Sequence, residues 1–147
     1  MFPKTELTKR AYLIACDAHF GQCDKAGQPY ILHPLAVADQ FDDERLAAAA
    51  LLHDVLEDSL EWTTARLYGH GIPPDIVRLV QTLTRREDET YFDYIRRIKP
   101  DPDATAIKTA DLRHNLRRSE TFTADLESLR KRYEKAIEIL ETESDKE

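Results

Sequence analysis

The sequence lacks the features of a secreted or membrane protein. It has only two cysteines, Cys16 and Cys23, which do not form a CxxC pair, so a disulfide framework is excluded. No apolar run approaches the roughly 20 residues that a membrane-spanning helix needs. The first ten residues are polar and charged, and no apolar segment typical of a signal peptide follows them. These absences predict a cytoplasmic protein with no membrane partner.

Positive charge is also scarce. Lysine and arginine total 21 against 28 aspartates and glutamates, which gives a net charge of −7 at pH 7. Such an acidic chain is not expected to bind nucleic acid. An anionic substrate would need a metal ion or a local basic patch to receive it. With 41% hydrophobic and 33% charged residues over 147 positions, the composition predicts one globular domain spanning residues 1–147.

No segment alternates between apolar and polar residues as a β-strand does, and the chain has no internal repeat or linker. The sequence therefore predicts an all-α fold of about eight helices without a sheet. Capping residues, prolines and glycines set the expected boundaries. The expected helices are Thr5 (as N-cap) to about Phe20, Pro34–Phe41, Asp43–Asp58, Thr63 to Gly69–Gly71, Pro73–Leu83, Glu89–Lys99, Asp103–Arg118 and Thr123–Thr142, with residues 143–147 fraying.

The stretch AAAALLHDVLEDS, residues 47–59, is the chemically richest part of the chain. On a helix, His53, Asp54, Glu57 and Asp58 would fall within an arc of roughly 140°, opposite a leucine-rich face. Carboxylates on neighbouring turns repel each other unless they are separated, protonated or neutralised by a cation. Two interpretations stay open on this evidence: a metal site with acid–base carboxylates beside it, or a solvated acidic face.

The segment TAIKTADLRHNL, residues 105–116, adds a second candidate cluster. Lys108, Asp111 and Asn115 share one helical face, and a carboxylate among apolar neighbours needs a partner. A cation held by two imidazoles and two carboxylates would serve, and the set would comprise His33, His53, Asp54 and Asp111. These donors suit Mn²⁺, Fe²⁺, Zn²⁺ or Mg²⁺, and the lack of thiolates argues against a structural zinc site.

Three segments resemble the HD-domain metal-dependent phosphohydrolases, in particular the (p)ppGpp hydrolase domain of RelA/SpoT-type enzymes and their small stand-alone relatives. They are AHFGQCDKAGQPYILHP (18–34), ALLHDVLEDS (50–59) and IKTADLRHN (107–115), in the order that the family has them. GIPPDIVRLVQTLTR (71–85) matches the family's stretch after the His-Asp pair. The resemblance covers about residues 7–118, and a C-terminal helix is expected over 121–142.

The resemblance implies a site as well as a fold. One divalent ion, usually manganese in this branch, would be bound by His33, His53, Asp54 and Asp111. Glu57 and Asp58 match the acidic pair that handles protons and orients the attacking water. His19 matches a motif position where a packed histidine that fixes the loop is the expected role. Substrate contacts are expected from Asp24, Lys25, Lys108, Asn115 and Arg118.

The reaction implied is hydrolysis of the 3′-pyrophosphate of ppGpp or pppGpp, which connects the chain to alarmone metabolism and the stringent response. The sequence departs from the family at Asp24, where an arginine is usual, and at Arg118, where a small hydroxylic residue is common. Arg118 could replace the charge lost at position 24. The departures leave two alternatives open: an HD phosphohydrolase for another nucleotide, such as NADPH or a nucleoside phosphate, or a non-enzymatic, metal-stabilised nucleotide-binding module.

Two further features are left undecided by the sequence. Arg85, Arg86, Arg96 and Arg97 could form a phosphate-facing patch or an ordinary solvated surface. The helical pattern is also as compatible with a homodimer as with a monomer.

Overall fold

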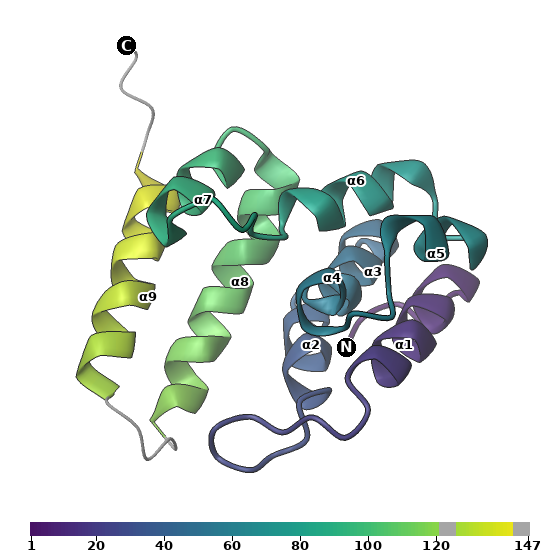
Figure 1. Ribbon diagram of the computed structural model, residues 1–147, viewed down its shortest axis with the longest axis horizontal. Coiled ribbons are helices and arrows are strands. Elements are labelled where there is room, and N and C mark those ends of the chain that lie inside the picture. The colour runs from purple at the N-terminus through teal and green to yellow at the C-terminus, as the bar shows by residue number, and fades with distance from the viewer. Residues whose placement is uncertain (121–125, 143–147) are drawn as a thin grey trace.

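The computed structural model describes residues 1–120 and 126–142, and over these residues it contains nine helices and no strand (Figure 1). The helices are α1 (Glu6–Ala18), α2 (Leu32–Ala38), α3 (Glu44–Leu52), α4 (Val55–Asp58), α5 (Thr64–Gly69), α6 (Pro74–Thr82), α7 (Tyr91–Ile98), α8 (Pro102–Ser119) and α9 (Leu126–Glu141). The predicted all-α class is confirmed. The predicted start of the last helix at Thr123 and the predicted fraying of 143–147 lie outside the described residues.

Local hydrogen bonds explain why most helices begin where the sequence predicts. The Thr5 hydroxyl accepts a hydrogen bond from the Thr8 backbone N–H, and the Thr8 hydroxyl accepts one from the Thr5 N–H, which completes a capping box. Thr63 caps α5 in the same way through the Arg66 N–H. Asp101 accepts two backbone hydrogen bonds at the start of α8. These caps satisfy N–H groups that have no partner within the helix.

The prediction of one helix over Asp43–Asp58 is wrong, because the helix is interrupted at His53 and Asp54 between α3 and α4. In an uninterrupted α-helix the carbonyl of Ala50 would accept from the N–H of Asp54. Here it accepts from the backbone N–H of His53 at 3.3 Å and from the His53 ring nitrogen Nδ1 at 2.6 Å. The histidine side chain thus competes with the backbone for this carbonyl, and the chain turns at the two residues that carry the candidate chemistry.

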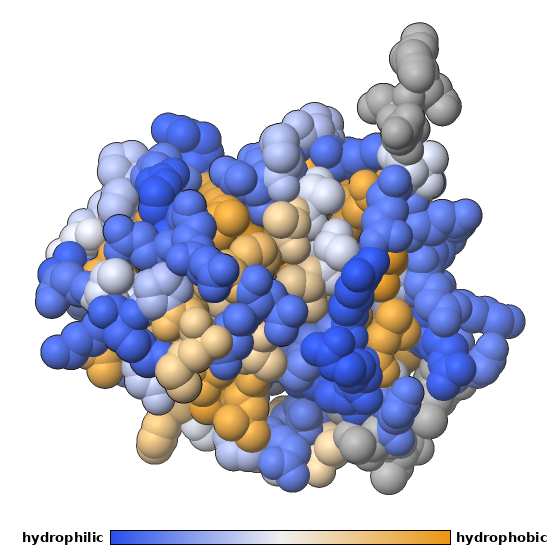
Figure 2. Space-filling model, turned by 180° about the vertical axis from the view of Figure 1, so that it is seen from behind, coloured by the Kyte–Doolittle hydropathy of each residue, from blue (hydrophilic) through white to orange (hydrophobic). Residues whose placement is uncertain are grey.

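Helix α3 lies at the centre of the fold, packed against α1, α2, α6 and α8, while α8 and α9 run side by side at the other end of the molecule (Figure 1). The four alanines of residues 47–50 are completely buried. Small side chains allow neighbouring helices to approach α3 closely from several directions. Seen from behind, the surface is mostly hydrophilic with separate apolar patches (Figure 2). No helix in the described ranges is long and apolar enough to cross a membrane.

The connection between α6 and α7 is braced by an ion pair. The Arg97 guanidinium donates to both carboxylate oxygens of Glu89 and to the backbone carbonyls of Thr82 and Thr84. The buried Tyr94 hydroxyl donates to the Leu83 carbonyl. These contacts fix the segment 83–90, which passes beside α4.

We expect Ala48→Leu to lower the free energy of unfolding by about 1–3 kcal/mol, because the added side chain has no space between the packed helices. Urea denaturation followed by circular dichroism measures the change. Ala65→Leu is the matched control, since Ala65 is an exposed helical alanine in α5. Equal unfolding midpoints for the two variants would contradict close packing around α3.

Candidate metal centre

Four side chains from three parts of the fold meet at one point. His33 comes from α2, His53 and Asp54 from the turn between α3 and α4, and Asp111 from α8. One nitrogen or carboxylate oxygen from each lies within 4.8 Å of all the others. His33 Nε2 is 2.6 Å and His53 Nε2 is 3.2 Å from Asp111 Oδ1, and His53 Nε2 is 3.1 Å from Asp54 Oδ2. The structure thus brings together the residues expected from the sequence to bind a metal ion.

The electrostatics of the cluster favour positive charge at its centre. Burial would lower the pKa of His53, but the carboxylates of Asp54 and Asp111 outweigh it and raise this pKa well above its ordinary value. His53 Nδ1 faces the Ala50 carbonyl, so this nitrogen carries a proton and Nε2 is directed at the carboxylates. Two imidazoles and two carboxylates in this arrangement fit a divalent cation of borderline or hard character.

Two contacts around the cluster involve residues to which the sequence analysis gave no role. His114 Nδ1 lies 2.7 Å from His33 Nδ1, with the two rings stacked. Partial burial, together with His33 and nearby arginines, lowers the pKa of His114 to about 4. The neutral ring can then accept the proton of His33 Nδ1, which leaves His33 Nε2 directed at the cluster. The Tyr30 hydroxyl donates to Asp54 Oδ2 at 2.5 Å.

A sequence signal existed for His114, which follows Asp111 by three positions on the same helix and so shares a face with it. Tyr30 lies in the turn before α2, where helical spacing gives no such signal. His19 has the packing role that was expected of it. The residue is 3% exposed, and its ring Nδ1 lies 3.0 Å from Gln22 Oε1, within the loop that leads to α2.

Lys108, which is predicted to contact the substrate, is held against Asp111. The residue is only 9% exposed, and its ammonium donates to Asp111 Oδ2 at 2.8 Å. Burial would raise the pKa of the Asp111 carboxyl, but Lys108 and His53 outweigh it and hold this pKa well below its usual range. Lys108 therefore contacts the Asp111 oxygen that the two histidines do not contact, and it keeps the carboxylate charged and fixed.

Glu57 and Asp58 lie on α4 beside the cluster and face solvent. Partial desolvation, the Asp54 carboxylate and Glu57 raise the pKa of Asp58 to about 7. Desolvation also raises the pKa of Glu57, although the backbone N–H of Arg85 donates to its Oε2 at 2.5 Å and favours the charged form. The structure therefore places two carboxyl groups with raised pKa values next to the candidate metal centre, as acid–base chemistry requires.

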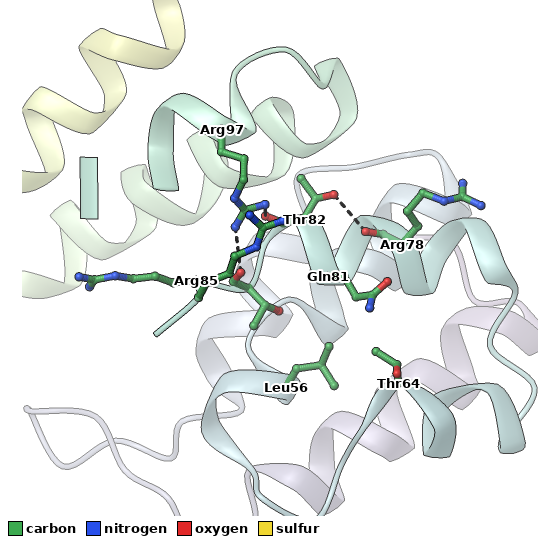
Figure 3. A pocket seen from close by; sticks show the side chains of 9 residues that line it. Leu56, Thr64, Arg78, Gln81, Thr82, Arg85 and Arg97 are labelled. Carbon is green, nitrogen blue, oxygen red and sulfur yellow. Dashed lines mark hydrogen bonds between the residues drawn. The ribbon is translucent and has the colours of Figure 1, made fainter. Parts of the chain in front are cut away.

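The arginines of segment 78–97 border a separate pocket of about 460 Å³ near α4 (Figure 3). Arg78, Arg85, Arg86 and Arg97 line it, whereas Arg96 pairs with Asp93 on the surface. Figure 3 shows Arg97 reaching down to Thr82, while Arg78 and Arg85 extend away from each other on opposite sides. Arg85, Arg86 and Arg97 thus line one pocket, and Arg96 is not among its lining residues.

A second hollow, of about 310 Å³, lies between the loop after α1 and the end of α8. Its lining includes Lys25, Asp24, Arg118 and Tyr30. Lys25 is exposed there, as a substrate contact should be. Asn115 lies deeper, with its amide nitrogen 3.4 Å from Asp111 Oδ1. Asp24 and Arg118, both predicted to contact substrate, face each other there, with Arg118 Nη1 3.4 Å from Asp24 Oδ2.

Comparison with known proteins agrees with this geometry. The family model of the HD domain matches residues 11–131, so the chain belongs to the HD-domain family. Within that family it is similar to the bifunctional (p)ppGpp synthase/hydrolase SpoT of Escherichia coli K12, at 35% identity over 123 residues, 74% of this chain and 17% of SpoT. The bifunctional (p)ppGpp synthase/hydrolase RelA of Mycobacterium tuberculosis is 34% identical over 130 residues, 80% of this chain and 18% of that protein.

A solved structure shares the fold. It is described as a metazoan orthologue of SpoT that hydrolyses ppGpp, and it superposes with a TM-score of 0.75 at 24% identity, covering 94% of this chain and 85% of the other. The match to the curated relatives spans less than a fifth of their length. The similarity therefore concerns their HD-domain portion.

Removing the buried ammonium should destabilise the protein strongly. We expect Lys108→Met to lower the free energy of unfolding by about 3–5 kcal/mol in metal-free buffer, because the Asp111 carboxylate loses a buried partner. Chemical denaturation measures this, with the exposed Lys9→Met of α1 as control. A loss below about 1 kcal/mol, as for a surface pair, would show that Lys108 does not support Asp111.

Proposed function

We propose that this protein is a metal-dependent hydrolase that removes the 3′-pyrophosphate of (p)ppGpp, giving GDP or GTP and pyrophosphate. One observation carries the proposal: four nitrogen and oxygen donors within 4.8 Å, with the acid pair Glu57 and Asp58 beside them. The activities named for the relatives, (p)ppGpp hydrolysis among them, support the substrate. We further propose that residues 1–147 form one HD domain that acts in the cytoplasm.

We infer that His33, His53, Asp54 and Asp111 hold one divalent ion, Mn²⁺ in the first instance. Fe²⁺, Zn²⁺ and Mg²⁺ also suit these donors. Neither cysteine belongs to the cluster, which is consistent with a catalytic rather than a structural site. Such an ion, when bound, polarises a phosphoryl oxygen and lowers the pKa of water.

The chain's own residues supply the proton chemistry. As a carboxylate, Asp58 can accept a proton from water, and its pKa of about 7 allows the protonated form to return it to a leaving oxygen. Glu57 is held toward the segment 83–90 by the Arg85 N–H, so its carboxylate has a fixed position at the edge of the site. Lys108, His114 and Tyr30 keep the proposed ligands oriented.

A second candidate function is hydrolysis of another nucleotide, such as NADPH or a nucleoside phosphate. The observation that favours it is the Asp24–Arg118 pair, which occupies the position of the arginine usual in this family. A purely nucleotide-binding module is less consistent with the site, because a binder does not need two carboxyl groups with raised pKa values at the metal centre.

The first experiment is a release assay with the manganese-loaded protein. We expect pyrophosphate from ppGpp and pppGpp, loss of activity with EDTA, and recovery when Mn²⁺ is restored. Asp111→Asn should lose both Mn²⁺ binding and turnover, while Asp103→Asn, an exposed residue of the same helix, should keep both. Turnover of NADPH or a nucleoside phosphate with ppGpp inert would favour the second candidate, and no turnover of any nucleotide would favour a binding module.

The acid pair can be tested apart from metal binding. We expect Glu57→Gln/Asp58→Asn to bind Mn²⁺ like the wild type, measured by calorimetry, and to lose roughly 10²–10⁴-fold in kcat. Glu61→Gln is the control, because Glu61 is an exposed acid just beyond α4. Retention of activity in the double variant would contradict the role of the pair.

The pH profile gives an independent test of Asp58. Because only the carboxylate accepts a proton, kcat/KM should fall as the pH decreases through the pKa of Asp58. That pKa is about 7 without a metal ion, and a bound dication favours the carboxylate, so the acid limb should lie below pH 7. Asp58→Asn should remove this limb. An acid limb that is unchanged in Asp58→Asn would exclude Asp58 as the base.

A further inference from the structure

The two positions at which the sequence departs from its family are in contact. An Arg118 Nη1 lies 3.4 Å from Asp24 Oδ2, although 94 positions separate the two residues in the chain. Their side chains are only 16% and 10% exposed. The pair links α8 to the loop 23–29 at the hollow that also contains Lys25. A partly buried pair of this kind is screened less by solvent than a surface pair.

Asp24 uses its other oxygen to shape the loop. Oδ1 accepts hydrogen bonds from the backbone N–H of Ala26 at 2.9 Å and of Gln28 at 3.0 Å. The backbone closes the same turn, with Asp24 N–H donating to the Gln28 carbonyl and Gly27 N–H to the Asp24 carbonyl. Gly27 has a φ of +86°, which a side-chain-bearing residue would adopt only with strain. One oxygen of the Asp24 carboxylate thus stabilises the loop, and the other oxygen contacts Arg118 on α8.

Arg118 also fixes the orientation of Asn115. Its Nε and an Nη donate to the Asn115 amide oxygen at 2.9 and 2.7 Å. With the oxygen held by two donors, the Asn115 amide nitrogen is the end that faces Asp111 Oδ1. A chain of contacts therefore runs from the turn at residues 24–28 through Arg118 and Asn115 to a proposed metal ligand.

We propose that Asp24 and Arg118 form a positioning pair, which locks the loop 23–29 against α8 and fixes Asn115 as a hydrogen-bond donor at the metal centre. In this role Arg118 acts through Asn115 and Asp24. The cation that this hollow offers to a substrate phosphate is then Lys25, whose ammonium makes no hydrogen bond or ion pair with any described residue. This second part rests on the proposed function, whereas the locking of the loop does not.

Limited trypsin digestion of the manganese-loaded protein tests the lock without any substrate. Trypsin cleaves after Lys25, and a loop held on α8 is cut only when it opens locally. We expect Arg118→Gln and Asp24→Asn to accelerate cleavage after Lys25 roughly tenfold. Each variant loses a partly buried charged hydrogen bond, so the loop opens more often. Asp24→Asn keeps an oxygen for the loop N–H groups, so it removes chiefly the charge. Mass spectrometry separates this cut from those elsewhere.

Arg117→Gln is the matched control, because Arg117 is the exposed neighbour of Arg118 on α8; its cleavage after Lys25 should match the wild type. Arg118→Lys keeps the charge toward Asp24 but has no planar fork for the Asn115 amide. We expect it to protect the loop nearly as well as arginine. Unchanged cleavage in both Arg118→Gln and Asp24→Asn, with circular dichroism showing folded protein, would overturn the proposed lock.

Kinetics tests the link to Asn115. We expect Arg118→Lys to lower kcat with little change in KM, and Lys25→Gln to raise KM with little change in kcat. In an Asn115→Ala background, Arg118→Lys should have no further effect on kcat, since contacting residues are not additive. Additive losses would overturn the action through Asn115. If no variant and no wild type hydrolyses ppGpp, the proposed function fails, while the proteolysis result still decides the lock.

Discussion

The Asp111 carboxylate is the constraint on which the rest of the site depends. It is 3% exposed, and a charge at such depth is tolerated only if it is paired and hydrogen-bonded. His33 and His53 contact one of its oxygens and Lys108 contacts the other. These partners come from α2, from the end of α3 and from α8 itself. Satisfying one buried carboxylate therefore ties together three helices that are distant in sequence.

The turn at His53 and Asp54 follows from the same requirement. A regular helix would place both residues on its surface with the carboxylates that follow. Because the His53 ring bonds to the Ala50 carbonyl, helix α3 ends there. The side chain of His53 is then directed at Asp111, and that of Asp54 at Tyr30. The acid pair then lies at the end of a new short helix, α4, and stays open to solvent. The break separates His53 and Asp54, which we propose as ligands of a cation, from Glu57 and Asp58, whose carboxyl groups are open to water.

Two ion pairs position the irregular segments on either side of this centre. Arg97 and Glu89 brace the segment 83–90, whose Arg85 N–H contacts Glu57. Asp24 and Arg118 hold the loop 23–29 beside Asn115. In each pair the arginine comes from a helix and the acid shapes the neighbouring loop through backbone hydrogen bonds. Loops that carry function are thus placed by the rigid helices.

The sequence by itself determined the helical class, most helix starts and the identity of the cluster. Caps such as Thr5 and Thr63 act within four residues, so the local sequence contains the whole interaction. The motifs containing His33, the His53–Asp54 pair and Asp111 were readable because their spacing and order are linear properties. Glu57 and Asp58 were proposed as the acid pair for the same reason.

Only the tertiary structure decided where the helix after Asp43 breaks and which charges are partners. Helical periodicity predicts an unbroken helix, and it contains no information about a ring that competes for a carbonyl. Lys108 was predicted as a substrate contact from the sequence, which did not show that its ammonium is buried against Asp111. Asp24 and Arg118 looked like two separate departures, and packing brought them into one contact. Pairing across 94 positions depends on the whole fold, which no local pattern encodes.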